Sequence, residues 1–250
     1  MTATTRTRAR RTGLTVALIG CDGAGKTTVA RALERETDLP VRYLYMGVSG
    51  ASSNRRLLTS RLADAIKRAA GARGHDGAHA NGTGPAGAGG ANGASPNGAG
   101  EARRRRGGGA RAALRLANRL AEEWYRQLIA EAYRARGSIV VFDRHFLADY
   151  HAFDVAGAGR PLTRRIHGWM LWHAYPRPDL AVFLDAPPEV LYARKGEGTI
   201  ASLTRRRADY LGLAQAGEVA GSFAVVSATQ PLGAVIDEVA GIIREHAGRR

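Results

Sequence analysis

The stretch Gly20-Cys21-Asp22-Gly23-Ala24-Gly25-Lys26-Thr27 constrains the fold of this chain more than any other. It satisfies the pattern G-x-x-x-x-G-K-[ST] at every position, and this pattern is typical of a P-loop, which wraps a phosphate group. The apolar run 14–19 before it predicts a buried strand, and the run 28–34 after it predicts a helix. Because strand, glycine loop and helix follow in this order, the sequence predicts a site for a nucleoside triphosphate.

The residue types in this loop match the chemistry of phosphate binding. Glycines let the backbone curl around a phosphate, and the loop N–H groups and the helix N-terminus supply donors and positive potential. We expect Lys26 to reach the β- and γ-phosphates of ATP and the Thr27 hydroxyl to bind Mg²⁺. The expected nucleotide contacts are Gly20, Asp22, Gly23, Ala24, Gly25, Lys26, Thr27 and Thr28.

Length and composition favour one cytoplasmic α/β domain. The chain has 250 residues, enough for one domain with a substantial core or for a smaller domain with a long tail. Its single cysteine, Cys21, excludes an intramolecular disulfide and favours a reducing compartment. No apolar run approaches the length of a membrane helix, so we expect no membrane partner.

The net charge of +15 is concentrated in arginine clusters, including 103–106 and the basic segment 1–12. Such clusters fit anionic partners such as nucleotides, nucleic acid or acidic lipid. A chain rich in Arg, Ala and Gly from a GC-rich genome has the same composition, and we weigh the two explanations equally. We expect 1–12 to be a disordered arm.

The remaining pattern alternates strands and helices, which predicts a parallel sheet covered on both faces over residues 13–250. Residues 71–109 interrupt it with a Gly- and Ala-rich insertion that we expect to be disordered, and a tolerated loop is favoured over a binding arm. Further strands are expected at 41–46, 138–143, 180–185 and 223–226. Further helices are expected at 55–70, 114–136, 161–175, 187–195, around Tyr210 and Leu213, and at 232–246. Trp169 and Trp172 are expected in the core.

Asp143 ends one predicted strand and is followed by Arg144 and His145. A carboxylate at this place in a P-loop protein holds Mg²⁺, directly or through water. The Arg144 guanidinium is suited to a second phosphate, and the alternative is a buried Asp–Arg pair without a ligand. We interpret His145 as a supporting residue and not as a base.

A basic segment around 194–207 is interrupted by glycines. A mobile lid that closes over phosphates would have this composition, with arginines that neutralise charge on the transferred phosphoryl group. We select Arg194 and Arg206 as candidates, and the alternative is a solvated basic helix face. Asp22 is expected to face the acceptor or a metal-bound water, whereas Asp185 is interpreted as structural.

These stretches together resemble the thymidylate kinase-like group of P-loop nucleoside monophosphate kinases. The resemblance rests on 18–28, Asp143-Arg144-His145, 178–189 and 227–232, in matching order and spacing. It implies a three-layer α/β/α fold with a five-stranded parallel sheet in the order 2-3-1-4-5. It also implies transfer of the ATP γ-phosphoryl to a monophosphate, with thymidine monophosphate as the default acceptor.

The resemblance also implies roles for individual residues. Asp22 would contact the acceptor, and Asp143 and Arg144 would serve the metal and the acceptor phosphate. The loop that borders the adenine would consist of Ala228, Thr229 and Gln230. Because Gly23 and Ala24 are not arginines, the resemblance implies that the catalytic arginines belong to the lid.

The acceptor region departs from the family pattern. A Leu-Phe-Ala-Ala-Asp-Arg-like run is absent, Trp124-Tyr125-Arg126 occupies its region, and 148–153 replaces a Ser/Thr…Tyr-Gln group. A kinase of another small phosphorylated or hydroxylated molecule is therefore the first alternative. A nucleic-acid-associated ATPase ranks last because no nucleic-acid module is recognised, and a homodimer is left open.

Overall fold

The computed structural model describes residues 13–47, 98–155, 158–217 and 219–249. The expected arm 1–12, the expected helix 55–70 and residues 71–97 of the expected insertion lie outside this set. Residues 98–122 belong to a second compact unit, so the site below is built from the unit that holds the sheet.

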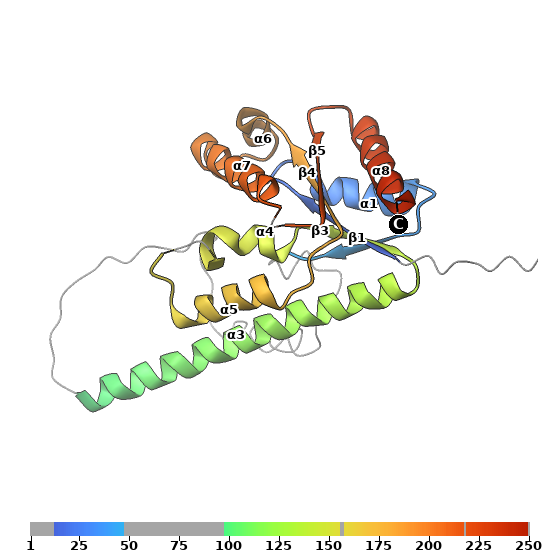
Figure 1. Ribbon diagram of the computed structural model, residues 1–250. Helices are drawn as coiled ribbons and strands as arrows, with labels where there is room; N and C mark the ends of the chain where they lie inside the picture. The colour runs from blue at the N-terminus through green and yellow to red at the C-terminus, as the bar shows by residue number, and fades with distance from the viewer. Residues whose placement is uncertain (1–12, 48–97, 156–157, 218, 250) are drawn as a thin grey trace, which may run out of the picture. The chain divides into compact units, whose positions relative to one another are not determined.

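Five parallel strands form one sheet in the order β2-β3-β1-β4-β5 (Figure 1), which confirms the predicted α/β fold and strand order. The central strand β1 is buried along its whole length, as expected for a parallel strand covered on both faces. The strands are β1 (Leu14–Ile19), β2 (Val41–Tyr45), β3 (Ile139–Asp143), β4 (Leu180–Asp185) and β5 (Ser222–Ser227).

Helices flank this sheet, and α1 and α8 pack against each other on one side of it, with α5 on the other (Figure 1). Ala130 of α3 and Leu171 of α5 are buried in the core together with the strand residues. The helices are α1 (Lys26–Glu36), α3 (Gly98–Ala135), α4 (Phe146–Tyr150), the π-helix η1 (His151–Val155), α5 (Leu162–His173), α6 (Pro188–Lys195), α7 (Ile200–Gln215) and α8 (Leu232–Gly248).

Two features of the helices differ from the sequence prediction. Helix α3 begins at Gly98, inside the range expected to be a disordered insertion, so that boundary was wrong. The run 101–106 is Glu, Ala and four arginines, all good helix formers, and the helix continues through the three glycines 107–109 into residues 110–135. The short helices α4 and η1 were not predicted, because a segment of this length carries no clear hydrophobic period.

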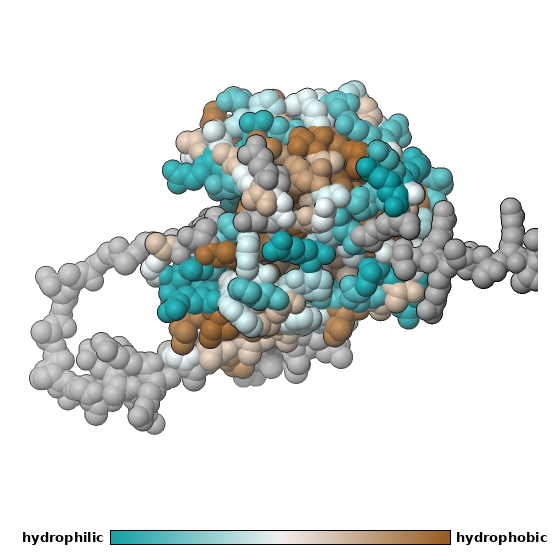
Figure 2. Space-filling model, in the orientation of Figure 1, coloured by the Kyte–Doolittle hydropathy of each residue, from teal (hydrophilic) through white to brown (hydrophobic). Residues whose placement is uncertain are grey.

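Helix α5 exposes part of its apolar surface. Trp172 is partly buried and packs against the core, as expected, but Trp169 is 59% exposed, so its assignment to the core was wrong. Leu162 and Ile166 of the same helix are also exposed. In Figure 2, apolar atoms gather where Figure 1 draws α5. Among the helices described, none is both long and apolar enough to cross a membrane.

Candidate functional site

The loop between β1 and α1 has the backbone of a phosphate-binding loop. Gly20, Gly23 and Gly25 adopt φ values of 146°, 89° and 85°, which L side chains rarely tolerate. A Cβ at Gly20 would lie 2.7 Å from the Leu184 carbonyl oxygen, and one at Gly23 would lie 2.8 Å from the Leu191 carbonyl oxygen. The glycines are therefore needed both for the turn and for the close approach of the loop to β4 and α6.

Lys26 is the first residue of α1, and its side chain crosses the loop. Its Nζ donates hydrogen bonds of 2.7 Å to the carbonyl oxygens of both Gly20 and Cys21. Burial, together with the nearby charge of Arg144, lowers the pKa of Lys26 to about 8. The loop therefore holds an ammonium group away from bulk water at the start of a helix.

Thr27 and Asp143 meet beside the loop. Oδ2 of Asp143 accepts hydrogen bonds from Thr27 Oγ1 at 2.6 Å and from the Tyr43 hydroxyl at 3.1 Å. Asp143 is fully buried, and its Oδ1 has no hydrogen-bond partner. A buried, unsatisfied carboxylate oxygen next to a hydroxyl is a donor set that suits Mg²⁺.

The geometry fits Mg²⁺ better than a metal held by protein alone. In the described part of the chain, no cluster of three or more His, Cys, Asp or Glu side chains is positioned to hold a metal ion. Mg²⁺ in nucleotide sites keeps waters and phosphate oxygens as most of its ligands, so one carboxylate and one hydroxyl are sufficient.

Asp22 connects the loop to two arginines from different parts of the chain. Its Oδ1 accepts a 2.6 Å bond from Nη2 of Arg144, and its Oδ2 accepts a 2.8 Å bond from Nη1 of Arg206. Burial opposes ionisation of Asp22, but the charges of Arg144 and Lys26 prevail and lower its pKa to about 2. The structure thus brings together three residues that we singled out from the sequence.

Arg144 has a φ of 73°, and among the described residues it is the non-glycine residue with a positive φ. Its N–H donates to the Leu18 carbonyl oxygen at 3.2 Å, which ties this conformation to β1. Strained backbone of this kind clusters at functional sites, because the surrounding structure must hold it in place. Here the turn directs the guanidinium toward the loop carboxylate.

A cavity of about 610 Å³ opens beside Arg144 and Asp22. Nη1 of Arg144 lies 3.8 Å from Oδ2 of Asp149, and the Tyr210 hydroxyl donates to Oδ1 of Asp149 at 3.2 Å. Burial raises the pKa of Asp149. The cavity is lined by Asp22, Arg144, Ala148, Asp149, His151, Ser202, Arg205, Arg206, Asp209, Tyr210 and Leu213.

The other arginines of the basic segment 194–207 have different partners. Arg207 donates two hydrogen bonds to Asp185, which agrees with the structural role expected for this aspartate. Arg194 does not line the cavity; its Nη1 donates to the Ala228 carbonyl oxygen at 2.9 Å. Of the two candidate lid arginines, the structure therefore joins Arg206 to the P-loop and Arg194 to the segment after β5.

Thr229 and Gln230 follow β5 and are exposed. The Thr229 hydroxyl lies 2.8 Å from that of Ser227, and Gln230 Nε2 donates to Glu238 at 2.9 Å. The contact of Arg194 with Ala228 brings that arginine to the same segment.

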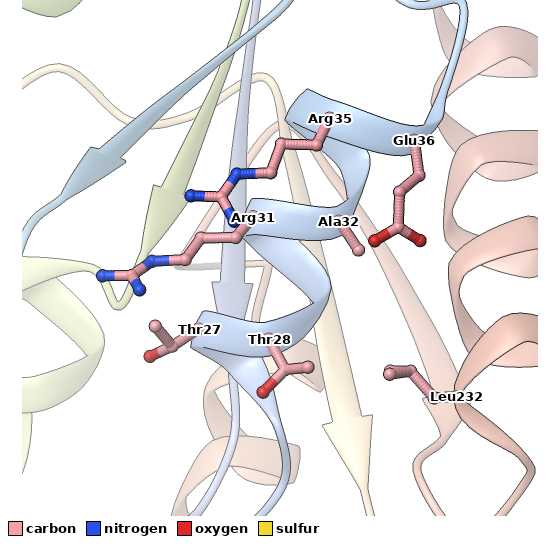
Figure 3. A pocket seen from close by; sticks show the side chains of 7 residues that line it. All are labelled: Thr27, Thr28, Arg31, Ala32, Arg35, Glu36 and Leu232. Atoms are coloured by element: carbon pink, nitrogen blue, oxygen red, sulfur yellow. The ribbon is translucent and has the colours of Figure 1, made fainter.

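A second, smaller cavity of about 290 Å³ lies along α1. Figure 3 shows Arg31 and Arg35 extending from the same side of α1, with Thr27 and Thr28 at the start of the helix. The Arg31 guanidinium also lies 5.5 Å from the ring centroid of Tyr43, the tyrosine that binds Asp143. The cavity is lined by Thr27, Thr28, Arg31, Ala32, Arg35, Glu36 and Leu232.

His145 follows Arg144 but is fully enclosed, and its ring lies 5.9 Å from that of Phe142. Burial lowers the pKa of His145 to about 4, so it is neutral at pH 7. These properties agree with a supporting role.

Two residues of the candidate site were not predicted from the sequence. Tyr43 looked like an ordinary strand residue, and only the pairing of β2 with β3 places its hydroxyl on Asp143. Asp149 was considered only as part of a departure from a family pattern. A helix that begins just after Arg144 would place Asp149 in its first turn, as α4 does.

Comparison with known proteins supports a relationship to thymidylate kinases. The chain is similar to a thymidylate kinase from Burkholderia thailandensis, with 32% identity over 127 residues. The match covers 46% of this chain and 59% of the relative, so the chain spans less than two thirds of the length of the curated protein it matches. No family model matches the chain.

Proposed function

We propose that this protein is an ATP-dependent phosphotransferase that moves the γ-phosphoryl group of ATP to a small phosphorylated acceptor. A nucleoside monophosphate is the leading acceptor class, and thymidine monophosphate is the first member to test. The observation that carries the proposal is the shared position of Asp22, which belongs both to the P-loop and to the lining of the large cavity. The similarity to a thymidylate kinase supports it independently.

On the nucleotide side, the loop amides would bind the phosphates of ATP. Lys26 would exchange its two carbonyl partners for phosphate oxygens. Hydrogen bonds from an ammonium group to a charged phosphate oxygen are stronger than those to a neutral carbonyl. Thr27 and Asp143 would hold Mg²⁺, which neutralises phosphate charge. Thr229 and Gln230 would border the adenine, with Arg194 beside them.

On the acceptor side, Arg144 would orient the phosphate of the acceptor, and Arg206 would neutralise charge on the phosphoryl group in transit. Both arginines already contact Asp22, so donor and acceptor phosphates would meet at this carboxylate. Catalysis would then consist of positioning and electrostatic stabilisation, without a covalent intermediate.

A second candidate is a kinase of another small phosphorylated or hydroxylated molecule. The charged lining of the cavity favours it, because Asp149, Asp209 and Ser202 are suited to hydroxyl groups. Tyr210 is the one tyrosine among the described lining residues. Its hydroxyl donates a hydrogen bond to Asp149, and its ring packs against that of Phe183 with centroids 5.7 Å apart.

The test is ADP release with Mg²⁺ and ATP across a panel of nucleoside monophosphates, sugar phosphates and polyols. The proposal predicts saturable, acceptor-dependent turnover with thymidine monophosphate or another monophosphate. Turnover with a sugar phosphate or polyol alone would favour the second candidate. ATP hydrolysis that no acceptor stimulates would contradict both.

Two arginine variants make this test specific. Arg144→Ala should raise the KM for the acceptor far more than the KM for ATP. Arg244→Ala is the matched control, because Arg244 of α8 forms an exposed pair with Asp38, and such pairs contribute little. Equal effects of both variants would contradict the role of Arg144.

A further inference from the structure

A second polar cluster lies outside the phosphate site, and it is buried. His167 of α5 is fully enclosed, with Nδ1 2.6 Å from Oδ2 of Asp154 and Nε2 3.0 Å from Oε2 of Glu123. Asp154 lies in η1 and Glu123 in α3, and both carboxylates are buried. The Tyr175 hydroxyl donates to the same oxygen of Glu123 at 2.9 Å. One imidazole therefore joins three elements of the fold.

The geometry of this cluster requires a proton. A neutral imidazole has one N–H donor and one lone pair, so it can donate to one carboxylate only. Its other nitrogen would then direct a lone pair at a carboxylate oxygen at hydrogen-bonding distance. An imidazolium donates to both carboxylates, and the two carboxylates raise the pKa of His167, so the pair of contacts favours the charged ring.

The cluster packs against the segment that forms one wall of the large cavity. The segment 146–155, which forms α4 and η1, begins directly after Arg144 and His145. Ala148, Asp149 and His151 of this segment line the cavity. Tyr150 of the same segment makes an edge-to-face contact with the His167 ring, with centroids 4.8 Å apart.

The backbones of α5 and η1 also touch at this point. A Cβ at Gly168 would lie 1.9 Å from the Asp154 carbonyl oxygen, so a glycine is needed next to His167. Arg160 donates to the same carbonyl oxygen. With so close an approach, a change at the His167–Asp154 contact is transmitted directly to η1.

We propose that His167, as an imidazolium held between Asp154 and Glu123, is a positioning residue that fixes the α4–η1 wall of the acceptor cavity. His167 itself is 0% exposed, so it does not touch the acceptor or the reacting atoms. The assignment of the ligand rests on the proposed function, but the control of the wall does not.

The direction of the pH dependence follows from the groups that face His167. Asp154 from η1 and Glu123 from α3 raise the pKa of His167, although burial opposes them. Tyr150 faces the ring from α4, Tyr175 reaches it only through Glu123, and Arg164 lies 3.7 Å from Asp154. Because the folded-state pKa lies above the unfolded value, the stabilisation is complete below the unfolded pKa and is lost as pH rises through the folded pKa.

The experiment compares the full chain with Glu123→Gln. In this variant a neutral imidazole satisfies both neighbours, because Nδ1–H donates to Asp154 and Nε2 accepts from the new amide. Asp154→Asn tests the same idea from the other side, with the two nitrogens exchanging roles. His173→Asn is the control, since His173 is an exposed histidine on the same helix.

Hydrogen–deuterium exchange of residues 146–155 is measured at pH 6 and pH 9, corrected for the intrinsic exchange rate. We expect protection of this segment to fall roughly tenfold at pH 9 in the wild type and in His173→Asn. The same fall should be absent in Glu123→Gln and in Asp154→Asn. An equal fall in all four proteins, or none in the wild type, would overturn the proposal.

Binding of thymidine monophosphate is measured on the same samples. We expect its Kd to rise roughly tenfold between pH 6 and pH 9 in the wild type and to change less in Glu123→Gln. Failure of this ligand to bind at any pH, with the exchange result as expected, would count against the proposed acceptor and leave the role of His167 intact. A Kd with the same pH dependence in both proteins would overturn the coupling of His167 to the site.

Discussion

Arg207 donates two parallel hydrogen bonds to Asp185, at 2.6 and 2.7 Å. Its neighbour Arg206 instead contacts Asp22 of the P-loop. Adjacent arginines on α7 thus have different contacts, since Arg207 binds the end of β4 and Arg206 binds the loop between β1 and α1.

This difference predicts different kinetic effects. Arg206→Ala should lower kcat by about a thousandfold, the scale of an arginine that stabilises a phosphoryl group in transit. Arg207→Ala should lower kcat by about tenfold or less, because Arg207 contacts Asp185 in a part-exposed pair and not the Asp22 carboxylate. ADP release at saturating ATP and acceptor measures both. Similar losses in the two variants would contradict the assignment.

Lys26→Ala should reduce ATP-dependent turnover by at least about a hundredfold, since it removes a cation aimed at the transferred phosphate. The fold should survive, because β1 and α1 are held by the apolar core. Circular dichroism and steady-state kinetics on the same preparation separate the two effects. Full activity in a folded variant would refute the role of this loop.

Lys26 also predicts a pH dependence of stability without nucleotide. Its folded-state pKa is about 8 and its unfolded value is 10.5, so the unfolded chain binds more protons between these values. The free energy of unfolding of the wild type relative to Lys26→Met should therefore rise with pH across this interval, by at most about 3 kcal/mol. Urea unfolding at pH 7.5 and pH 10 measures it. A relative stability that stays constant or falls would show that folding does not lower the pKa of Lys26.

Asp143→Asn should raise the Mg²⁺ concentration needed for half-maximal activity by about 10- to 100-fold, because the amide offers a neutral ligand in place of a carboxylate. Thr27 and Tyr43 can still donate to the amide oxygen, so the local structure should persist. Titration of activity with Mg²⁺ measures the change. An unaltered Mg²⁺ requirement would exclude Asp143 from the metal site.

Gly168→Ala should destabilise the fold by about 1–3 kcal/mol, because the new methyl group would overlap the Asp154 carbonyl. Gly241→Ala is the matched helical control, since nothing lies within 4 Å of its Cβ position. That change should stabilise α8 by about 0.5–1 kcal/mol. Thermal unfolding of both variants gives the comparison, and equal shifts in Tm would contradict the close packing of α5 on η1.

The architecture could be predicted because its signals are local. The buried strand before Gly20 and the strand ending at Asp143 are continuous apolar runs, and the glycine loop between strand and helix sets the start of α1. The strand order followed from the resemblance, which also pointed to Asp22 as an acceptor-side carboxylate.

The polar contacts could not be predicted in the same way. The partners of His167 lie 44 and 13 residues away in sequence, on elements whose packing no local pattern encodes. No sequence pattern predicts the positive φ of Arg144 either, since arginine has no preference for that conformation. Trp169 shows the opposite failure, because its apolar character suggested burial that the packing of α5 does not provide.

The double contact of Asp22 places one carboxylate against two arginine side chains. Arg144 and Arg206 are already neutralised by a carboxylate before any phosphate arrives. A ligand must therefore compete with an anion that is tethered to the loop and cannot diffuse away. Weak monovalent anions have little advantage over it, whereas a phosphate group with nearly twice the charge does. In the proposed function, the Asp22 carboxylate would therefore favour phosphate over common small anions at these two arginines.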